Sequence, residues 1–430
     1  MSSAITLPPE VLLLVFENAD GYIPGFIDPD ALRCASERNA TLAACAVVCK
    51  SWAAPAQMTL FRDITLGITT DNVDEEEVAH HADNERPGST TPALTSLVRT
   101  LEEFRDNGSK IPHNIRAVHF YIGETDMLNF NPDFEVDYVI HGSPAAVFRA
   151  IALCPGLVHL SITLGLYHED DDRSAAPMFS AEDIAMLKGI AGDLPNLRQL
   201  SLQMPNDTDL VMHSGYCFTS YESANTIIAA LSDRITLLDV SIRRADDVGG
   251  DWPSDDDEAG GGAIDAFPKL HTFRSAGDTY NIRTTILRHA PCLRRAVLFP
   301  YRSLAEAKRV APDSIQELTI GSLREEDDLS SFGELEALEI LDFVRVTKTD
   351  LPVLKTLPRT LRKLILPATA LEVDSMAQKV AEAVRGLPNL ESITAVQVPW
   401  AQAVVKQVCH LPVHIVPHTQ QWQRLIPCTE

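Results

Sequence analysis

The 430-residue sequence lacks a long apolar run, a basic leader and any Cys-x-x-Cys pair. A membrane-spanning helix needs about 18 consecutive apolar residues, and a signal peptide begins with basic residues before an apolar stretch. The eight cysteines are scattered, and a chain of this length needs no disulfides for stability. The sequence therefore predicts an intracellular protein, cytoplasmic, nuclear or both, that does not act at a membrane.

Basic residues are also scarce. Lys and Arg number 36 against 60 Asp and Glu, so the formal net charge is -24. Nucleic acids and anionic lipids require clustered Lys and Arg. Neither is therefore expected as a partner. Short acidic runs, predicted to be solvated loops, begin at Asp74, Glu169, Asp255 and Glu325.

Sequence motifs of catalysis and cofactor binding are missing as well. The chain has no phosphate-binding loop, no Gly-x-Ser-x-Gly elbow, no His-Glu-x-x-His and no Gly-x-Gly-x-x-Gly. His410, His414 and His418 are spaced by four, but Pro412 and Pro417 would break a helix through them. We therefore expect no catalytic residue, no cofactor and no metal, and a protein that is not an enzyme.

One short template recurs along the chain: an apolar residue, two positions, an apolar residue, one position, an apolar residue. Leu197-Arg-Gln-Leu200-Ser-Leu202 and Leu361-Arg-Lys-Leu364-Ile-Leu366 are examples. The alternation at its end predicts a short strand with one buried face. Ten segments fit, and they begin at Ile115, Leu157, Leu197, Ile235, Leu270, Leu293, Ile315, Leu338, Leu361 and Leu390.

The intervals between these segments contain apolar residues at helical spacing, and most of them end with a proline. The spacing of apolar residues predicts helices at 145–153, 181–194, 223–231, 282–289 and 376–384. Proline stands two or three residues before eight of the ten segments. Because proline cannot continue a helix and favours extended geometry before it, each is expected to end a helix and start the next strand.

A unit of one strand and one helix cannot bury its apolar face alone, so such units must stack. Successive segments from Leu270 to Leu361 are 23, 22, 23 and 23 residues apart, too short for a full crossover helix with its loops. The pattern resembles divergent leucine-rich repeats. It predicts an α/β fold, a curved solenoid with a parallel sheet over residues 61–416, followed by a tail at 417–430.

The prediction includes a first strand and a facing helix, and it has one competing fold. Phe61 to Leu66 also fits the template and would be the first strand, faced by a helix over residues 91–104. A doubly wound α/β sheet, as in a hydrolase or transferase, is the competing fold. Its strands would be more uniformly apolar on both faces, and its site would be a polar cluster at one end of the strands.

The N-terminal region predicts two short helices. Leu7-Pro-Pro-Glu10 suits a helix start, because proline fits the first turn and an acid favours the positive end of the helix dipole. A second helix begins at about Thr41, with apolar residues in steps of three and four up to Trp52. Pro55 is expected to end it.

These N-terminal residues resemble an F-box motif. The resemblance rests on Leu7-Pro-Pro-Glu10, on Val48-Cys-Lys-Ser-Trp52 and on Leu60-Phe-Arg-Asp-Ile64, and the motif would span residues 5–60. Leucine-rich repeats commonly follow an F-box. The link at residues 18–40 is longer than is usual between the first two helices of the family.

The resemblance implies a partner and a role. F-box proteins dock a Skp-type adaptor, which joins them to a cullin-RING ubiquitin ligase, while the repeats hold a protein substrate. The chain would then be a substrate-recognition subunit. The residues that the resemblance assigns to the adaptor surface are Leu7, Pro8, Glu10, Val11, Leu14, Leu42, Val48 and Trp52.

The substrate itself cannot be identified from the sequence. In solenoids the concave strand face usually binds the partner, so positions between the repeat leucines are expected to point to solvent and contact the substrate: Arg198, Gln199, Ser201, Gln203, Arg362, Lys363 and Ile365. An alternative is an acidic leucine-rich-repeat scaffold that binds a basic protein without any coupling to a ubiquitin ligase.

Overall fold

The structure is a computed structural model. It divides into two compact units, of which unit 1 holds the described residues up to 231 and unit 2 those from 232. In these residues no helix is both long and apolar enough to cross a membrane. The described residues are 43–45, 50–65, 92–127, 137–142, 144–164, 179, 181–203, 220–241, 266–276, 286–287, 289–299, 314–320, 335–343, 357–366, 378, 380–382, 384–396 and 412–416.

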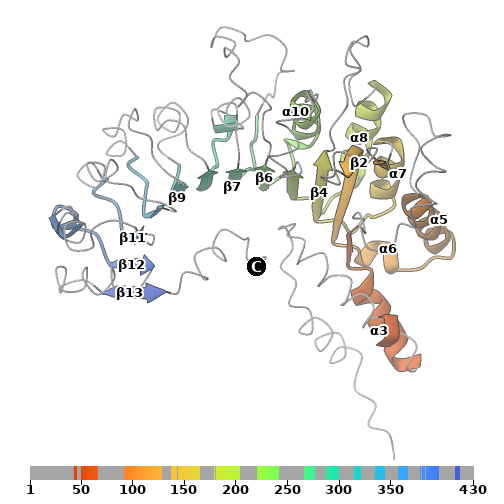
Figure 1. The fold of residues 1–430 in the computed structure, drawn as a ribbon, viewed down its shortest axis with the longest axis horizontal. Coiled ribbons are helices and arrows are strands. Elements are labelled where there is room, and N and C mark those ends of the chain that lie inside the picture. Colours follow the sequence, from red (N-terminus) through yellow and green to blue (C-terminus); the bar gives the residue numbers. More distant parts are fainter. Residues whose placement is uncertain are drawn as a thin grey trace, which may run out of the picture. The chain divides into compact units, whose positions relative to one another are not determined.

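Unit 1 alternates helices with strands (Figure 1). Its strands β1, β2, β4 and β5 are parallel neighbours in that order, and β3 pairs antiparallel with β2. The strands are β1 (Asp63–Thr65), β2 (Ala117–Met127), β3 (Asp137–Gly142), β4 (His159–Leu164) and β5 (Gln199–Gln203). The helices are α3 (Lys50–Leu60), α5 (Pro92–Asp106), α6 (Ile111–Asn114), α7 (Pro144–Ala152), α8 (Ala181–Asp193) and α10 (Ser220–Leu231).

Unit 2 holds a second run of parallel strands. Each pairs with the next one along the chain, so the strand order follows the sequence. The strands are β6 (Leu237–Ser241), β7 (Thr272–Ala276), β8 (Arg295–Phe299), β9 (Glu317–Ile320), β10 (Ile340–Phe343), β11 (Lys363–Leu366), β12 (Ser392–Val396) and β13 (Val413–Val416).

The α/β class and the parallel pairing are therefore confirmed, and all ten template segments contain a strand. A doubly wound sheet would reverse its strand order at a switch point. In unit 2 the order runs from β6 to β13 without reversal. The sequential order is the one expected when each coil stacks on its predecessor.

The apolar template positions form the interior of both units. Burying a side chain of this size stabilises the fold by about 2 kcal/mol. Ser275 and Ala296 stand at template positions and are buried too, so the stack continues there with less apolar area. Fully buried template residues include Leu157, Leu160 and Ile162 in unit 1, and Leu293, Leu338, Leu341, Leu361, Leu364 and Leu366 in unit 2.

A four-residue turn leads into most strands. The backbone N–H of Leu157 donates to the carbonyl of Cys154 at 3.0 Å, and Leu293 donates to Ala290 at 3.1 Å in the same way. Proline takes the second position of this turn, where its fixed φ suits the common β-turns. The prolines in that position are Pro155, Pro195, Pro268, Pro291 and Pro388.

The helices of unit 1 form a layer beside its strands (Figure 1). α5 packs on α7, α7 on α8 and α8 on α10, and α7 also contacts β2. The rings of Phe61 and Phe104 meet edge to face with centroids 5.6 Å apart, so the end of α5 lies against the start of the first strand. The helices predicted at 91–104, 145–153, 181–194 and 223–231 are confirmed. Those predicted at 282–289 and 376–384 are helical at the residues that the structure describes.

The expectation that Pro55 ends its helix is wrong. α3 continues through Pro55 to Leu60, although proline removes one helical hydrogen bond and crowds the preceding turn. Ala56 is fully buried, and Cys45, Trp52 and Leu60 pack against it. This burial offsets the lost bond. The Thr59 hydroxyl also donates to the Pro55 carbonyl at 3.1 Å.

Candidate functional site

In each template segment one residue follows the first apolar position. These residues form a regular row, which we call the strand-start row. At every position of the row except Arg198 and Glu391, the carbonyl is seen to accept two N–H groups from the next segment. For example, Arg116 N–H at 2.7 Å and Ala117 N–H at 3.2 Å both donate to the Arg62 carbonyl. This backbone pattern fixes the spacing between the side chains of the row. In unit 1 the row is Arg62, Arg116, Val158 and Arg198, and in unit 2 it is Thr236, His271, Arg294, Gln316, Glu339, Arg362 and Glu391.

Opposite charges alternate over the last three positions of this row in unit 2. Arg362 lies 3.6 Å from Glu339 on one neighbouring coil and 2.7 Å from Glu391 on the other. The hydrogen bond to Glu391 and its charge raise the pKa of Arg362. All three side chains are about half exposed. Charged groups of a partner could therefore form ion pairs with them.

A second ion pair lies one position further along the strands of unit 2. Arg295 on β8 and Glu317 on β9 are partners in register and lie 3.3 Å apart. Both side chains are about 40% exposed. Screening by water makes such pairs weak contributors to stability, so they define a mixed-charge surface rather than hold the fold.

The strand face between the template positions is largely buried in unit 1, where solvent exposure was expected. His119 on β2 bonds through Nδ1 to the Ser161 hydroxyl at 2.6 Å and through Nε2 to the Thr163 hydroxyl at 3.2 Å. On β4, His159 Nε2 bonds to the Ser201 hydroxyl at 2.9 Å. All five side chains are less than 10% exposed.

Burial controls the charge of this polar ladder. It lowers the pKa of His119 to about 3, with a further contribution from nearby His159, and lowers the pKa of His159 itself to about 4. Both imidazoles are therefore neutral at pH 7, when one ring nitrogen donates and the other accepts. Neutral rings suit hydroxyl partners, which can do either.

The Ser161–His119 contact invites comparison with a nucleophile and its base. A base with a pKa of about 3 withdraws a proton from serine poorly at neutral pH. The cluster also lies in mid-strand rather than at the strand ends, where α/β enzymes place their sites. The pair therefore serves packing. In the described part of the chain, no group of three or more His, Cys, Asp and Glu is placed to hold a metal ion.

A charged pair, whose aspartate is half-buried, occupies the corresponding face of unit 2. Asp239 on β6 and Arg274 on β7 are partners in register, and Arg274 is 5% exposed. Burial raises the pKa of Asp239 to about 6, while the charge of Arg274 lowers it. In both units, the first strands therefore carry polar side chains on this face that are at least partly shielded from solvent.

The structure separates the expected substrate-binding residues into two groups. Arg198 and Arg362 are exposed, and Gln199, Gln203 and Lys363 are half-buried. The expectation of solvent exposure is wrong for Ser201 and Ile365, which are 2% and 6% exposed. Ser201 is held by its bond to His159, and Ile365 is covered on the face opposite the core leucines.

Trp52 is the one proposed adaptor residue that lies within the described range. It is half-buried on α3, where it packs against Ala56. α3 then leads through a short turn into β1, with the Phe61 N–H donating to the Gln57 carbonyl at 3.0 Å. The other residues lie outside the described residues: Leu7, Pro8, Glu10, Val11, Leu14, Leu42 and Val48.

Comparison with known proteins assigns no family. No protein-family model matches the chain, and no curated protein matches it either.

Proposed function

We propose that the chain is a non-enzymatic substrate-recognition subunit of a Skp-cullin-F-box type ubiquitin ligase, acting in the cytoplasm, the nucleus or both. In this proposal an F-box-like motif over residues 5–60 docks a Skp-type adaptor. A curved leucine-rich-repeat solenoid over residues 61–416 binds a protein substrate. The likeness of the N-terminal residues to an F-box and the stacked strands support it.

The observation that carries the proposal is the direct connection between α3 and the sheet. α3 contacts both β1 and α6, and β1 pairs with β2 from Asp63 to Thr65. An adaptor bound at α3 would thus be held in a fixed orientation to the strands of unit 1. A ligase needs this rigidity, because the substrate must be presented at a defined place.

Loss of adaptor binding on substitution of Trp52 tests the proposal. The intact chain is expected to co-purify with a Skp-type adaptor, and Trp52→Ala is expected to weaken the complex by about tenfold or more, since aromatic anchors dominate interfaces. Gln57→Ala, at an exposed position of the same helix, is the matched control and should bind normally. Circular dichroism must show that both variants keep their repeats folded. Failure of the intact chain to bind any Skp-type adaptor would contradict the proposal.

The acidic-scaffold alternative makes a different prediction in the same system. Association with a basic protein would weaken steeply with salt and would survive removal of residues 1–60. The net charge of -24 is the observation in its favour. Against it, the strand-start row of unit 2 and the neighbouring Arg295–Glu317 pair mix both signs of charge instead of presenting acids alone.

A further inference from the structure

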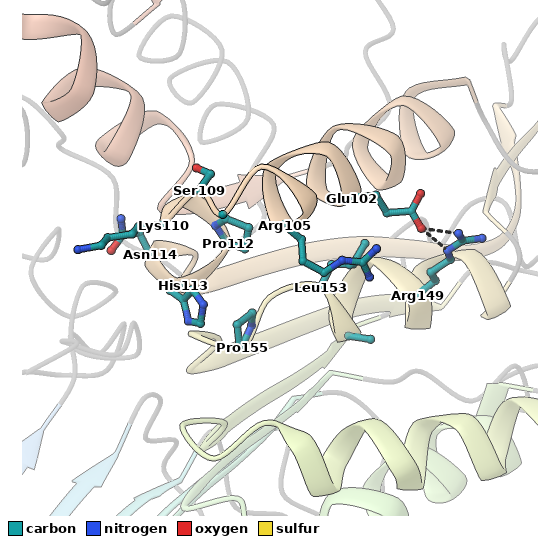
Figure 2. Close-up of a pocket in the computed structure, with 12 residues that line it drawn as sticks. Glu102, Arg105, Ser109, Lys110, Pro112, His113, Asn114, Arg149, Leu153 and Pro155 are labelled. Carbon is teal, nitrogen blue, oxygen red and sulfur yellow. Dashed lines mark hydrogen bonds and ion pairs between the residues drawn. The ribbon is translucent and has the colours of Figure 1, made fainter.

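A cavity of about 630 Å³ lies in unit 1 where α5, α6 and α7 meet (Figure 2). Pro112, Leu153 and Pro155 supply apolar lining, and Figure 2 shows His113 beside Pro155. Its size falls within the range of about 300 to 1,000 Å³ that is typical of ligand sites. This cavity is no part of the adaptor motif or the strand face.

The charges around the cavity run against the charge of the whole chain. Arg105, Lys110 and Arg149 line it, against the single carboxylate of Glu102. The chain as a whole carries -24. A local surplus of positive charge on such a protein is the feature that requires explanation.

The carboxylates here are already engaged by arginines. Arg149 Nε donates to Glu102 at 2.9 Å, the contact drawn between α7 and α5 in Figure 2. Arg105 pairs at 3.0 Å with Asp106, which follows it on α5. Lys110 is exposed and makes no ion pair with any residue that the structure describes. Its ammonium group therefore adds an uncompensated positive charge at the cavity rim.

The backbone holds this rim in place. α5 ends in a Schellman motif, in which the Ser109 N–H donates to the Phe104 carbonyl at 2.8 Å and the Gly108 N–H donates to Arg105 at 3.0 Å. Gly108 has the positive φ of 66° that this motif requires. The Ser109 hydroxyl then accepts the Ile111 N–H at 3.2 Å, at the start of α6. A rim fixed in this way loses little entropy when it binds a ligand.

We propose that this cavity binds an acidic segment of a protein partner, in which carboxylates alternate with apolar side chains. The carboxylates would meet Lys110, Arg105 and Arg149, and an apolar side chain would cover Leu153 and Pro155. Nucleic acid fits less well, because the rest of the chain is acidic. The proposal does not depend on ubiquitin coupling, since the site includes no residue of the adaptor motif.

Binding of a fluorescent peptide of alternating Glu and Leu to the full chain, followed by anisotropy, tests the proposal. Lys110→Glu is expected to weaken binding by about tenfold, since it replaces an attractive charge with a repulsive one. Glu102→Gln is expected to strengthen binding by about threefold, because it removes the only carboxylate of the lining and releases Arg149. Matched controls are Lys188→Glu on α8 and Glu103→Gln on α5, exposed positions outside the lining. Both should change the affinity by less than about twofold.

Several outcomes would overturn the site. One is equal weakening by Lys110→Glu and Lys188→Glu, which would mean that only the overall charge matters. Others are equal binding of a peptide of alternating Gln and Leu, or no binding by the unmodified chain. Strong competition by inorganic phosphate would indicate a small-anion site in place of a peptide site. Because no adaptor is present in the assay, its result is independent of the ligase proposal.

Discussion

Gly156→Ala is expected to destabilise unit 1 by about 3 kcal/mol or more. A Cβ atom at this position would lie 2.0 Å from the backbone oxygen of His113 and 3.0 Å from that of Ile115. Backbone oxygens cannot rotate away as a flexible side chain can, so α6 and the turn before β4 would have to separate. Urea unfolding followed by circular dichroism measures the loss.

Gly189→Ala is the matched control, and its sign should be opposite. Gly189 lies inside α8, and a Cβ there would meet nothing within 4 Å. Alanine is a better helix former than glycine by about 0.5 to 1 kcal/mol. The same substitution should therefore stabilise the protein slightly at one site and destabilise it severely at the other. Equal effects would contradict the close approach of α6 to the turn.

The position of Gly156 illustrates why the sequence predicted the turns but not their surroundings. Asn196, Lys269, Cys292 and Asn389 occupy the equivalent turn positions and carry side chains. Only local rules are needed to predict a turn that contains proline before a leucine. The backbone contact with α6 depends on a neighbour some 40 residues away, and no local rule gives it.

Most strands were predictable because they also follow a local sequence rule. Two strands were missed because they do not follow it. Eleven strands, β1 among them, follow a template that is local in sequence. β13 begins at Val413 without the leading leucine of that template, and β3 is an antiparallel addition to β2. β13 continues the parallel stack without the full template, and β3 lies off the stack, so the sequence periodicity could not reveal either strand.

The buried face of unit 1 shows the limit of alternation as a guide. Alternation indicates that a strand has two faces, but it does not tell which of them water reaches. Ser201 was therefore expected at the surface. Aligning the segments that begin at Ile115, Leu157 and Leu197 places His119, Ser161 and Ser201 in one column, as the register confirms. That column was a usable signal of a polar ladder.

The same ladder should make unit 1 sensitive to acid, with a loss of about 2 to 3 kcal/mol per histidine between about pH 7.5 and about pH 4.5. Burial holds the pKa of His119 at about 3 and that of His159 at about 4. Their pKa in the unfolded chain is 6.5. Below pH 6.5 the two histidines bind protons in the unfolded chain but stay neutral in the folded chain. The stabilisation is thus complete above pH 6.5 and is lost as the pH falls toward the folded pKa values.

Urea unfolding at both pH values, for the natural chain and for a double variant with His119→Asn and His159→Asn, isolates this effect. The variant is expected to be less stable at neutral pH, because it changes a packed ladder, but to lose less stability on acidification. Asp239 in unit 2 works in the opposite direction, since burial raises its pKa to about 6. It is present in both chains, so its contribution cancels in the comparison.

The natural chain and the double variant are compared by the stability that each loses on acidification. The difference shows whether the histidines stay neutral in the folded state. If both chains lost the same stability on acidification, the histidines would be accepting protons while folded, which their hydroxyl partners and burial should prevent. A neutral ladder also has a consequence for binding. Because His119 and His159 carry no charge at pH 7, the charges that this strand face offers a partner come from other residues, such as Arg198 in unit 1 and Arg362 in unit 2, both exposed in the strand-start row.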